Sequence, residues 1–311
     1  MTEPFLVLPK ISSAKFFSLA KIAFAVTLIL NIHVNPSLAD PFRTTEPRNI
    51  GDKTEAAFKA IFEQGNYPAA ESTVQEALVA EPNEPLAHAM KASLAYTNKD
   101  WATLEAYSKK TLESAQKLIP EDPLRGNLYT AVGYFLEGAV ILQREGTLSG
   151  APKALSRLNQ VYDHLDKAEA VSPTDPELNL VKGYMDLMLA VNLPFSNPEQ
   201  AIEKLAKNAG PRYLVDRGIA LAYRDTKQYS QALDYANRAL KATPDNPESY
   251  YLKAQILREQ AKKDKNTKFM QEAIDNFDKA LSKKAQLPAS IVKQIERERG
   301  KAAKEITTVS K

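Results

Sequence analysis

Few residues of this sequence are of the types that carry out acid–base, nucleophilic or metal chemistry. The chain has no Cys and only three His, which excludes disulfides, thiolate nucleophiles and zinc sites built on Cys. His88 and His164 lie in separate helical stretches, and neither has a His or Glu four residues further on. We expect His88 to pack between helices and His164 to lie at the surface. The sequence therefore predicts no metal site and no cofactor.

Motifs for phosphate binding or for a nucleophilic serine are also missing. The sequence has no Gly-x4-Gly-Lys-Ser/Thr loop and no Gly-x-Ser-x-Gly turn. Acidic residues are abundant, but most fall at expected helix starts and exposed faces, where capping and i,i+4 pairing explain them. Their spacing alone does not exclude a catalytic pair of acids. The residue types favour a protein that is not an enzyme.

The balance of charges argues against a nucleic-acid partner. The 311 residues include 41 Lys and Arg against 38 Asp and Glu, a net charge of +3, and 44% of them are hydrophobic. Nucleic-acid binding depends on an excess of basic residues that neutralise phosphates. We therefore expect a globular chain that does not bind DNA or RNA.

The first 39 residues have the order of a secretory signal. Three Lys precede an uncharged apolar run over residues 22–30, and Ser37-Leu38-Ala39 forms a small-x-small cleavage site. The apolar run ends near Ile32, short of the roughly 20 residues that a membrane-spanning helix needs. We expect residues 1–39 to be a signal peptide cleaved after Ala39, in preference to an uncleaved anchor. The mature protein would then be exported and would have no stable membrane anchor.

Four Pro-x-x-Pro sequences mark the turns between stretches of helical periodicity. They begin at Pro82, Pro120, Pro173 and Pro244, and the residue before each second proline is Glu84, Asp122, Asp175 or Asn246. Three of these four are favoured helix N-cap residues, and proline is well tolerated at the first helical position. The first proline of each motif ends the preceding helix. We interpret the motifs as turns between helices and not as polyproline ligands.

A stripe of small and apolar residues at offsets of four and three recurs along the chain. Such offsets put side chains on one face of a helix, where small residues let a neighbouring helix approach closely. The members of the stripe are Ala70, Val74 and Ala77; Val161, Leu165 and Ala168; Ala232, Ala236 and Ala239; and Ala273, Phe277 and Ala280. The recurrence predicts an array of helix pairs.

One stretch resembles a known repeat family closely. Ile219-Ala220-x2-Tyr223, followed by Tyr229 and Ala232, is similar to the pattern of the tetratricopeptide repeat (TPR). The pattern is most complete over residues 213–244, 54–82 and 248–284, and it is degenerate over 86–119, 124–172 and 177–209. The sequences Lys53-Thr-Glu-Ala-Ala-Phe58, Asp122-Pro-Leu-Arg-Gly-Asn-Leu-Tyr129 and Asn192-Leu-Pro-Phe-Ser-Asn-Pro198 also resemble those of exported cyanobacterial TPR proteins of unassigned function. These proteins point to the periplasm, or alternatively to the thylakoid lumen, as the compartment.

The TPR resemblance implies an all-α, right-handed helical solenoid of about six helix pairs. We expect an extended segment at 40–51, the solenoid at 52–287, and a C-terminal capping helix and tail at 288–311. Residues 146–150, 192–197 and 262–268 are expected to be insertions inside the third, fourth and sixth pairs. A terminal unit of such an array needs a polar outer face.

The same resemblance implies a concave groove that binds a protein or peptide partner. The groove-facing positions carried over from the family are Glu55 and Lys59, Ser93 and Tyr96, Thr130 and Tyr134, Leu180 and Tyr184, Leu221 and Arg224, and Tyr251, Gln255 and Arg258. Tyr and Arg are enriched at binding hot spots, so the candidate contact residues are Tyr96, Tyr134, Tyr184, Arg224, Tyr251 and Arg258. Each Tyr could equally fill a gap between helices.

Two classes of function follow. The first is a non-catalytic scaffold that binds proteins or peptides and assists the assembly of envelope or lumenal proteins. The second is a cell-envelope enzyme, related to peptidoglycan, that uses the array as a substrate-binding arm. The loop residue Phe195 could contact a partner, or it could be tucked under its own helices.

Overall fold

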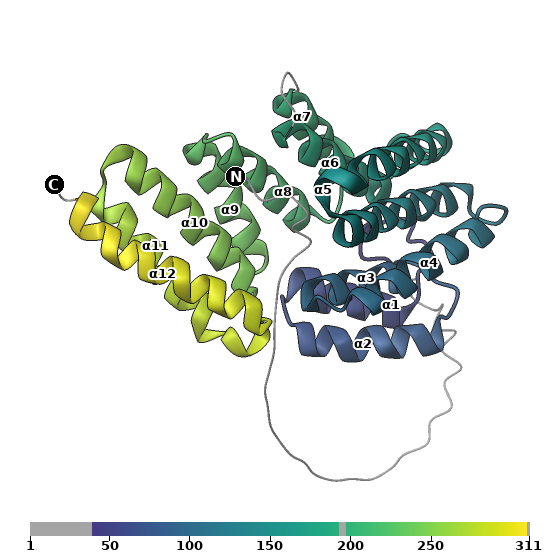
Figure 1. Cartoon of the computed structure of the whole chain (residues 1–311), viewed down its shortest axis with the longest axis horizontal. Helices are drawn as coiled ribbons and strands as arrows, with labels where there is room; N and C mark the ends of the chain where they lie inside the picture. Colours follow the sequence, from purple (N-terminus) through teal and green to yellow (C-terminus); the bar gives the residue numbers. More distant parts are fainter. Residues whose placement is uncertain (1–38, 193–196, 310–311) are drawn as a thin grey trace, which may run out of the picture.

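The computed structural model describes residues 39–192 and 197–309. These residues form an all-α helical solenoid of six helix pairs and a C-terminal helix, and no β-strand occurs among them (Figure 1). The predicted fold class is confirmed. Residues 1–38 of the predicted signal peptide and the candidate loop contact Phe195 lie outside the described residues.

The helices follow one another along the array with short connections. The first pair is α1 (Asp52–Phe58), continued by the π-helical turn η1 (Lys59–Glu63), and α2 (Tyr67–Ala80); the others are α3 (Pro85–Asn98) and α4 (Trp101–Leu118), the two arms of α5 (Pro123–Val171), α6 (Pro176–Asn192) and α7 (Pro198–Asn208), α8 (Arg212–Asp225) and α9 (Tyr229–Ala242), and α10 (Pro247–Asp264) and α11 (Thr267–Ser282). A 3-10 turn, η2 (Lys284–Gln286), leads to α12 (Ala289–Val309).

The Pro-x-x-Pro sequences are turns that start helices. The second proline of each motif is the first residue of α3, α5, α6 or α10. The side chain before it accepts a hydrogen bond from a backbone N–H in the first turn of the helix. The donors are Leu86 (2.9 Å), Arg125 (3.0 Å), Leu178 (3.0 Å) and Glu248 (2.9 Å). Glu84, the least favoured N-cap of the four by residue type, caps α3 as the others cap their helices.

The third pair is one long element, α5, that folds back on itself at Gly146. Gly146 has φ 76° and ψ 166°, a conformation that is essentially restricted to glycine. The arm after Gly146 packs against the arm before it. Arg157 of the second arm pairs with Glu137 of the first (2.9 Å), and His164 of the second hydrogen-bonds Asn127 of the first (2.8 Å). The predicted insertion at 146–150 is thus a turn with a single non-helical residue. The insertion predicted at 262–268 instead lengthens α10, which leaves only residues 265–266 as the turn.

Two layers of helices form the array. The first helices of successive pairs, α1, α3, α5, α6, α8 and α10, pack against one another, and α12 packs on α10 and α11 as the first helix of a next pair would. We call the surface of these first helices the inner face. The residues of the predicted stripe lie in the second helices and are buried, with at most 2% of any side chain exposed. Small stripe residues therefore join the two layers, as the spacing predicted.

The array curls until its sixth pair meets its first. The side-chain amide of Asn246, at the start of α10, donates to the backbone carbonyls of Phe62 and Glu63 at the end of η1, both at 3.2 Å. Gly65 follows in the same turn, and a Cβ at Gly65 would lie 2.4 Å from the Asn246 amide oxygen. The two units are in direct contact although 184 residues separate Phe62 from Asn246.

Candidate functional site

An extended segment, residues 39–51, lies against the array before the first helix begins. Its fold is organised by Asp40, whose side chain is fully buried. The carboxylate accepts hydrogen bonds from the backbone N–H of Phe42 and Arg48, both at 2.9 Å, and from the guanidinium of Arg43 at 2.5 Å. A charged group can be buried here because every contact it makes is with a donor.

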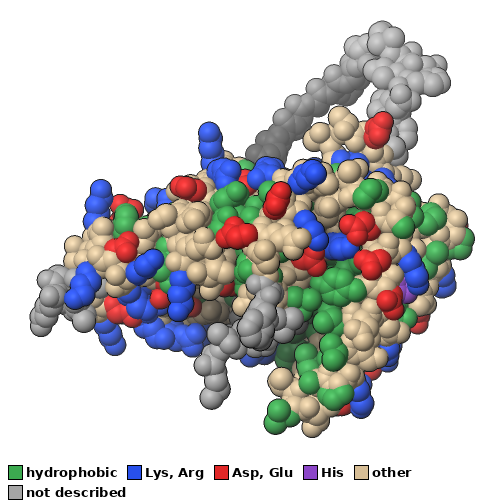
Figure 2. Space-filling view, turned by 90° about the horizontal axis from the view of Figure 1, so that it is seen from above, with side chains coloured by type: hydrophobic (Ala, Val, Ile, Leu, Met, Phe, Trp, Pro, Cys, Tyr) green, Lys and Arg blue, Asp and Glu red, His purple; other side chains and the backbone are tan. Residues whose placement is uncertain are grey.

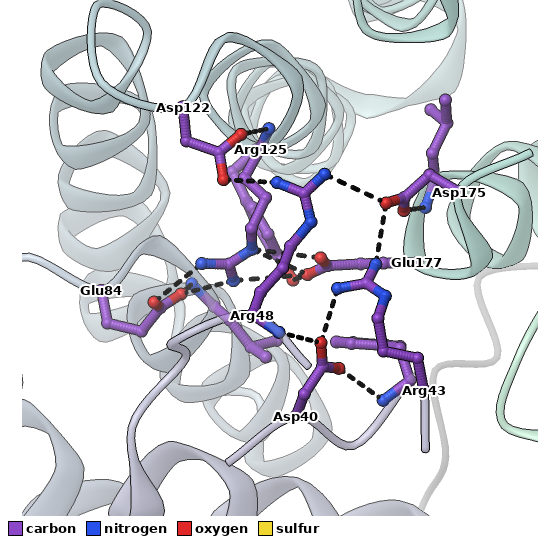
Figure 3. A network of polar contacts seen from close by, with 12 residues as sticks. Asp40, Arg43, Arg48, Glu84, Asp122, Arg125, Asp175 and Glu177 are labelled. Atoms are coloured by element: carbon purple, nitrogen blue, oxygen red, sulfur yellow. Dashed lines mark hydrogen bonds and ion pairs between the residues drawn. The ribbon is translucent and has the colours of Figure 1, made fainter. Parts of the chain in front are cut away.

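Two arginines of this segment fasten it to the helix N-termini (Figure 3). Arg43 pairs with Asp175 (2.8 Å), and Arg48 pairs with both Asp122 (2.6 Å) and Asp175 (3.3 Å). In each of these N-cap carboxylates, one oxygen accepts the helix N–H and the other accepts the arginine. The same two aspartates therefore start α5 and α6 and hold the N-terminal segment across them.

Arg125, in the first turn of α5, connects this network to the neighbouring pairs. It makes two hydrogen bonds to Glu84 (3.0 and 2.8 Å) and binds Glu177 at 3.1 Å, and Glu177 also accepts the hydroxyl of Tyr129 at 2.6 Å. Burial raises the pKa of Glu177, while Arg125 and Tyr129 act in the opposite direction. Burial acts to lower the pKa of Arg125, but Glu177 and Glu84 outweigh it and raise this pKa. Each carboxylate of the cluster has a donor, so the cluster ties three units together.

A pocket of about 210 Å³ opens on the inner face beside this network. All of its walls come from the first helices of the first five pairs and from the N-terminal segment, and none comes from α2, α4, α7 or α9. The lining residues are Phe42, Phe58, Phe62, Leu86, Ala89, Met90, Ser93, Tyr129, Val132, Phe135, Leu136, Leu180, Val181, Tyr184, Met185, Met188, Leu214, Arg217 and Leu221. Phe42 reaches the pocket because Asp40 before it and Arg43 after it hold the segment in place.

Arg217 is the one charged residue among those that line the pocket. Its Nη2 atom is bonded to the carboxylate of Glu248, the second residue of α10, and its Nη1 atom is buried without a hydrogen-bond partner. Burial raises the pKa of Glu248 to about 7, although Arg217 acts to lower it. The buried hydroxyl of Tyr67 also has no partner, and burial followed by Glu248 raises its pKa. The pocket thus has one charged lining residue, Arg217, and this residue carries an unsatisfied donor.

The structure brings some of the predicted groove residues to this pocket. Tyr184 lines it, together with the carried-over positions Ser93, Leu180 and Leu221. The Tyr184 hydroxyl donates to the Leu214 carbonyl (2.7 Å), and a Cβ at Gly218 would come within 2.8 Å of its ring. Tyr184 therefore fills the space between α6 and α8 as well as lining the pocket.

The other five candidates lie on the inner helices but outside the pocket. Tyr96 packs edge-on against Trp101, and Tyr134 packs against His164 and under the guanidinium of Arg157. Arg224 donates to Gln255 and Asp225. The C-terminal helix holds the remaining two, because Tyr251 donates to Glu298 (2.9 Å) and Arg258 pairs with Glu305 (2.5 Å). All five are half-buried.

The two histidines have structural surroundings. His88 is buried, with Nε2 at 2.9 Å from the Pro82 carbonyl and its ring 5.9 Å from that of Tyr107 in α4. This is the interhelix packing that the sequence predicted. His164 is half-buried between the arms of α5, which corrects the expected surface position. Burial lowers the pKa of both.

The described residues contain no group of three or more His, Asp or Glu side chains that could hold a metal ion. No helix in the described part of the chain is long and apolar enough to cross a membrane.

The sequence did not indicate the pocket or the network. Phe58, Phe62, Met90, Phe135 and Met188 carry no motif, and apolar residues on a first helix could equally be core. Arg43 and Arg48 lie in a segment without periodicity. The one signal in the sequence was the presence of two arginines whose charge is opposite to that of the helix-capping aspartates. The aspartates that they bind are 132 and 74 residues further along the chain, so the sequence did not show the pairing.

Figure 2 shows how polar and apolar side chains are distributed over one face. Lys, Arg, Asp and Glu alternate over the part that belongs to the C-terminal helices, whereas hydrophobic side chains gather toward the middle and right of the view. The apolar surface of this face is thus concentrated away from the C-terminal helices.

Comparison with known proteins places the chain in a repeat family. A family model described as tetratricopeptide repeat matches residues 56–103 and 217–288. A comparison with curated proteins gives no match. The two matched regions cover α1 to the start of α4 and α8 to the connection before α12, and the helix pairs between them stack in the same way. The chain therefore contains tetratricopeptide repeats in both of these regions.

Proposed function

We propose that this protein is a non-catalytic scaffold that binds a protein or peptide partner on its inner face. The observation that carries the proposal is the repeat itself: the first helices of six pairs stack side by side and present one surface across the whole array. TPR arrays bind partners on extended surfaces of this kind. The described residues offer several half-buried Tyr and Arg side chains on these helices, and these residue types dominate binding energy at interfaces.

The partner segment lies, in this proposal, across the row formed by Tyr96, Tyr134, Arg224 and Arg258. These residues come from α3, α5, α8 and α10, and none of them lines the pocket. Arg258 and Tyr251 are weaker candidates because α12 holds both side chains, through Glu305 and Glu298. Tyr184 is weaker still, since it fills the space between two helices.

A peptide selection tests this proposal. A library of random 12-residue peptides is selected on residues 40–311, and the affinity of the enriched peptide is measured for Tyr96→Ala and Arg224→Ala. We expect each change to weaken binding about tenfold, corresponding to roughly 1.4 kcal/mol at a hot spot. The matched controls are Tyr107→Ala and Arg238→Ala, on the second helices α4 and α9. Equal losses in the controls, or no enriched peptide, would overturn the proposal.

We further propose that the protein works in an exported compartment, the periplasm or the thylakoid lumen, after cleavage behind Ala39. The support is the order of charges, apolar residues and small residues in the first 39 positions. Fractionation of cells that express the full chain, followed by N-terminal sequencing, is the test. A mature N-terminus at Asp40 in the soluble exported fraction is expected. An intact N-terminus in carbonate-washed membranes would contradict it.

A further inference from the structure

The inner-face pocket has the size of a binding site for a small molecule. Protein interiors are packed so closely that voids larger than a water molecule are few. An apolar cavity of about 150 Å³ is enough to hold benzene. This pocket is about 210 Å³, and five consecutive pairs contribute apolar side chains to it. At about 30 Å³ for each water, its volume corresponds to roughly seven heavy atoms.

The walls suit a hydrocarbon chain better than a peptide. Among the lining residues only Ser93, Tyr129, Tyr184 and Arg217 have polar side chains. The hydroxyls of Tyr129 and Tyr184 already donate to Glu177 and to the Leu214 carbonyl. A peptide backbone inside the pocket would leave its own N–H and C=O groups unpaired, which costs free energy at each group. A hydrocarbon chain has no such groups.

The polar wall selects the charge of the occupant. Arg217 is the one charged lining residue, and its buried Nη1 lacks a partner while Nη2 is held by Glu248. An unsatisfied buried donor on a cation is costly, and a carboxylate is a suitable acceptor for it. A ligand with a cationic head would instead face the guanidinium at close range.

We propose that the pocket binds a single-chain carboxylic acid, with its hydrocarbon chain among Met90, Phe135, Leu180 and Met188 and its carboxylate beside the guanidinium of Arg217. An eight-carbon acid has seven carbons beyond its carboxyl carbon, and these match the roughly seven heavy atoms of the pocket volume when the carboxylate lies at the Arg217 wall. This site goes beyond the scaffold function, because it requires no protein partner and uses none of the row residues Tyr96, Tyr134, Arg224 and Arg258.

Calorimetric titration of residues 40–311 with three probes of equal chain length tests the proposal. The probes are octanoate, octan-1-ol and octyltrimethylammonium. Octanoate is expected to bind at least tenfold more tightly than octan-1-ol, and the cationic probe is expected to bind most weakly. Equal affinity for octanoate and octan-1-ol, preference for the cation, or no binding of octanoate would overturn the proposal.

Variants separate the head-group contact from the chain contact. Because Arg217→Met alone would leave Glu248 unpaired, the comparison is between Glu248→Gln and the double change Arg217→Met with Glu248→Gln. The double change should remove the tenfold preference for octanoate without altering octan-1-ol binding. Ala89→Leu should fill the pocket and weaken both probes at least tenfold, whereas Arg212→Met, on the same helix as Arg217 but outside the pocket, should change neither.

The native methionines give a readout that needs no variant. Met90, Met185 and Met188 line the pocket, whereas Met270 is fully buried in α11. In ¹³C-methyl spectra, octanoate is expected to shift the signals of the three pocket methionines and leave that of Met270 in place. Shifts at Met270 alone, or at none of the four, would overturn the proposal even if a variant failed to fold.

Discussion

Several single residues of this protein have two structural roles at once. Asp122 and Asp175 each start a helix with one carboxylate oxygen and hold an arginine of the N-terminal segment with the other. Asn246 caps α10 with its amide oxygen and binds the first pair with its amide nitrogen. The capping role could be predicted from the Pro-x-x-Pro spacing because capping is local in sequence. The second role could not, since its partners are brought close only by the packed array.

Arg125 is expected to be far more important for stability than an exposed arginine of the same helix. Its side chain is 4% exposed between Glu84 and Glu177, so Arg125→Met leaves two carboxylates buried without their cation. We expect a loss of about 3–5 kcal/mol in the free energy of unfolding, measured by urea denaturation. Arg144→Met, which breaks an exposed pair with Glu105, should change little. A similar small effect for both would show that the buried cluster does not stabilise the fold.

Glu248 is expected to make the fold less stable as the pH rises. Its pKa is about 7 in the folded chain against a usual 4.5, and the groups that face it are Arg217 from α8 and Tyr67 from α2. Between these two pH values the folded state binds more protons than the unfolded state. The free energy of unfolding should therefore fall by about 3 kcal/mol from pH 4.5 to 7.5 through this group.

The change Glu248→Gln isolates this contribution. The free energy of unfolding of the native chain, minus that of the variant, should become smaller as the pH rises over that range. Asp264→Asn, which removes an exposed carboxylate from the same helix, controls for the loss of one negative charge. If this value stayed constant or became larger with pH, the raised pKa of Glu248 would be contradicted.

At the scale of elements, the helix pairs were predictable and their lengths were less so. The Ala stripe and the proline turns repeat with periods that are visible in the sequence, because they reflect contacts within one pair. The extra residues at 262–268 were expected in a turn, but residues 262–264 extend α10 and residues 267–268 begin α11, since Lys continues a helix as readily as it ends one. The long element α5 has helical backbone angles throughout except at Gly146.

The turn of α5 depends on the backbone freedom of Gly146. A Cβ at this position would meet no atom within 4 Å, so any effect of Gly146→Ala comes from its positive φ. We expect a loss of about 1–3 kcal/mol in the free energy of unfolding. Gly300→Ala is the matched control, because Gly300 also has open space but lies inside helix α12. That change should stabilise the fold by about 0.5–1 kcal/mol. Equal effects of the two changes would contradict the turn geometry.

At the scale of the whole molecule, the array closes on itself through the contact between its sixth and first pairs. The family resemblance implied a concave groove but no closure, because the repeat pattern describes only neighbouring repeats. Contact between the first and sixth pairs depends on the summed curvature of units whose spacing in the sequence is irregular. The N-terminal segment then lies across the starts of α5 and α6, and α12 packs on α10. These long-range features determine where the pocket lies, and no local pattern encodes them.

Closure is expected to depend on the side-chain amide of Asn246. Asn246→Ser keeps a capping oxygen for α10 but removes the donor to Phe62 and Glu63. Hydrogen exchange measured by mass spectrometry should become about tenfold faster over residues 59–66. Asn266→Ser is the control, because Asn266 acts only as the cap of α11 through its amide oxygen. Unchanged exchange over 59–66 would show that the contact does not hold the first pair.

Photo-cross-linking tests most directly whether a partner binds on the inner face. A peptide selected on the native chain is made with a photoreactive phenylalanine, cross-linked, and its attachment points are mapped by mass spectrometry. Attachment to α3, the first arm of α5, α6, α8 and α10 is the predicted result. Attachment confined to the second helices α2, α4, α9 and α11 would contradict the claim.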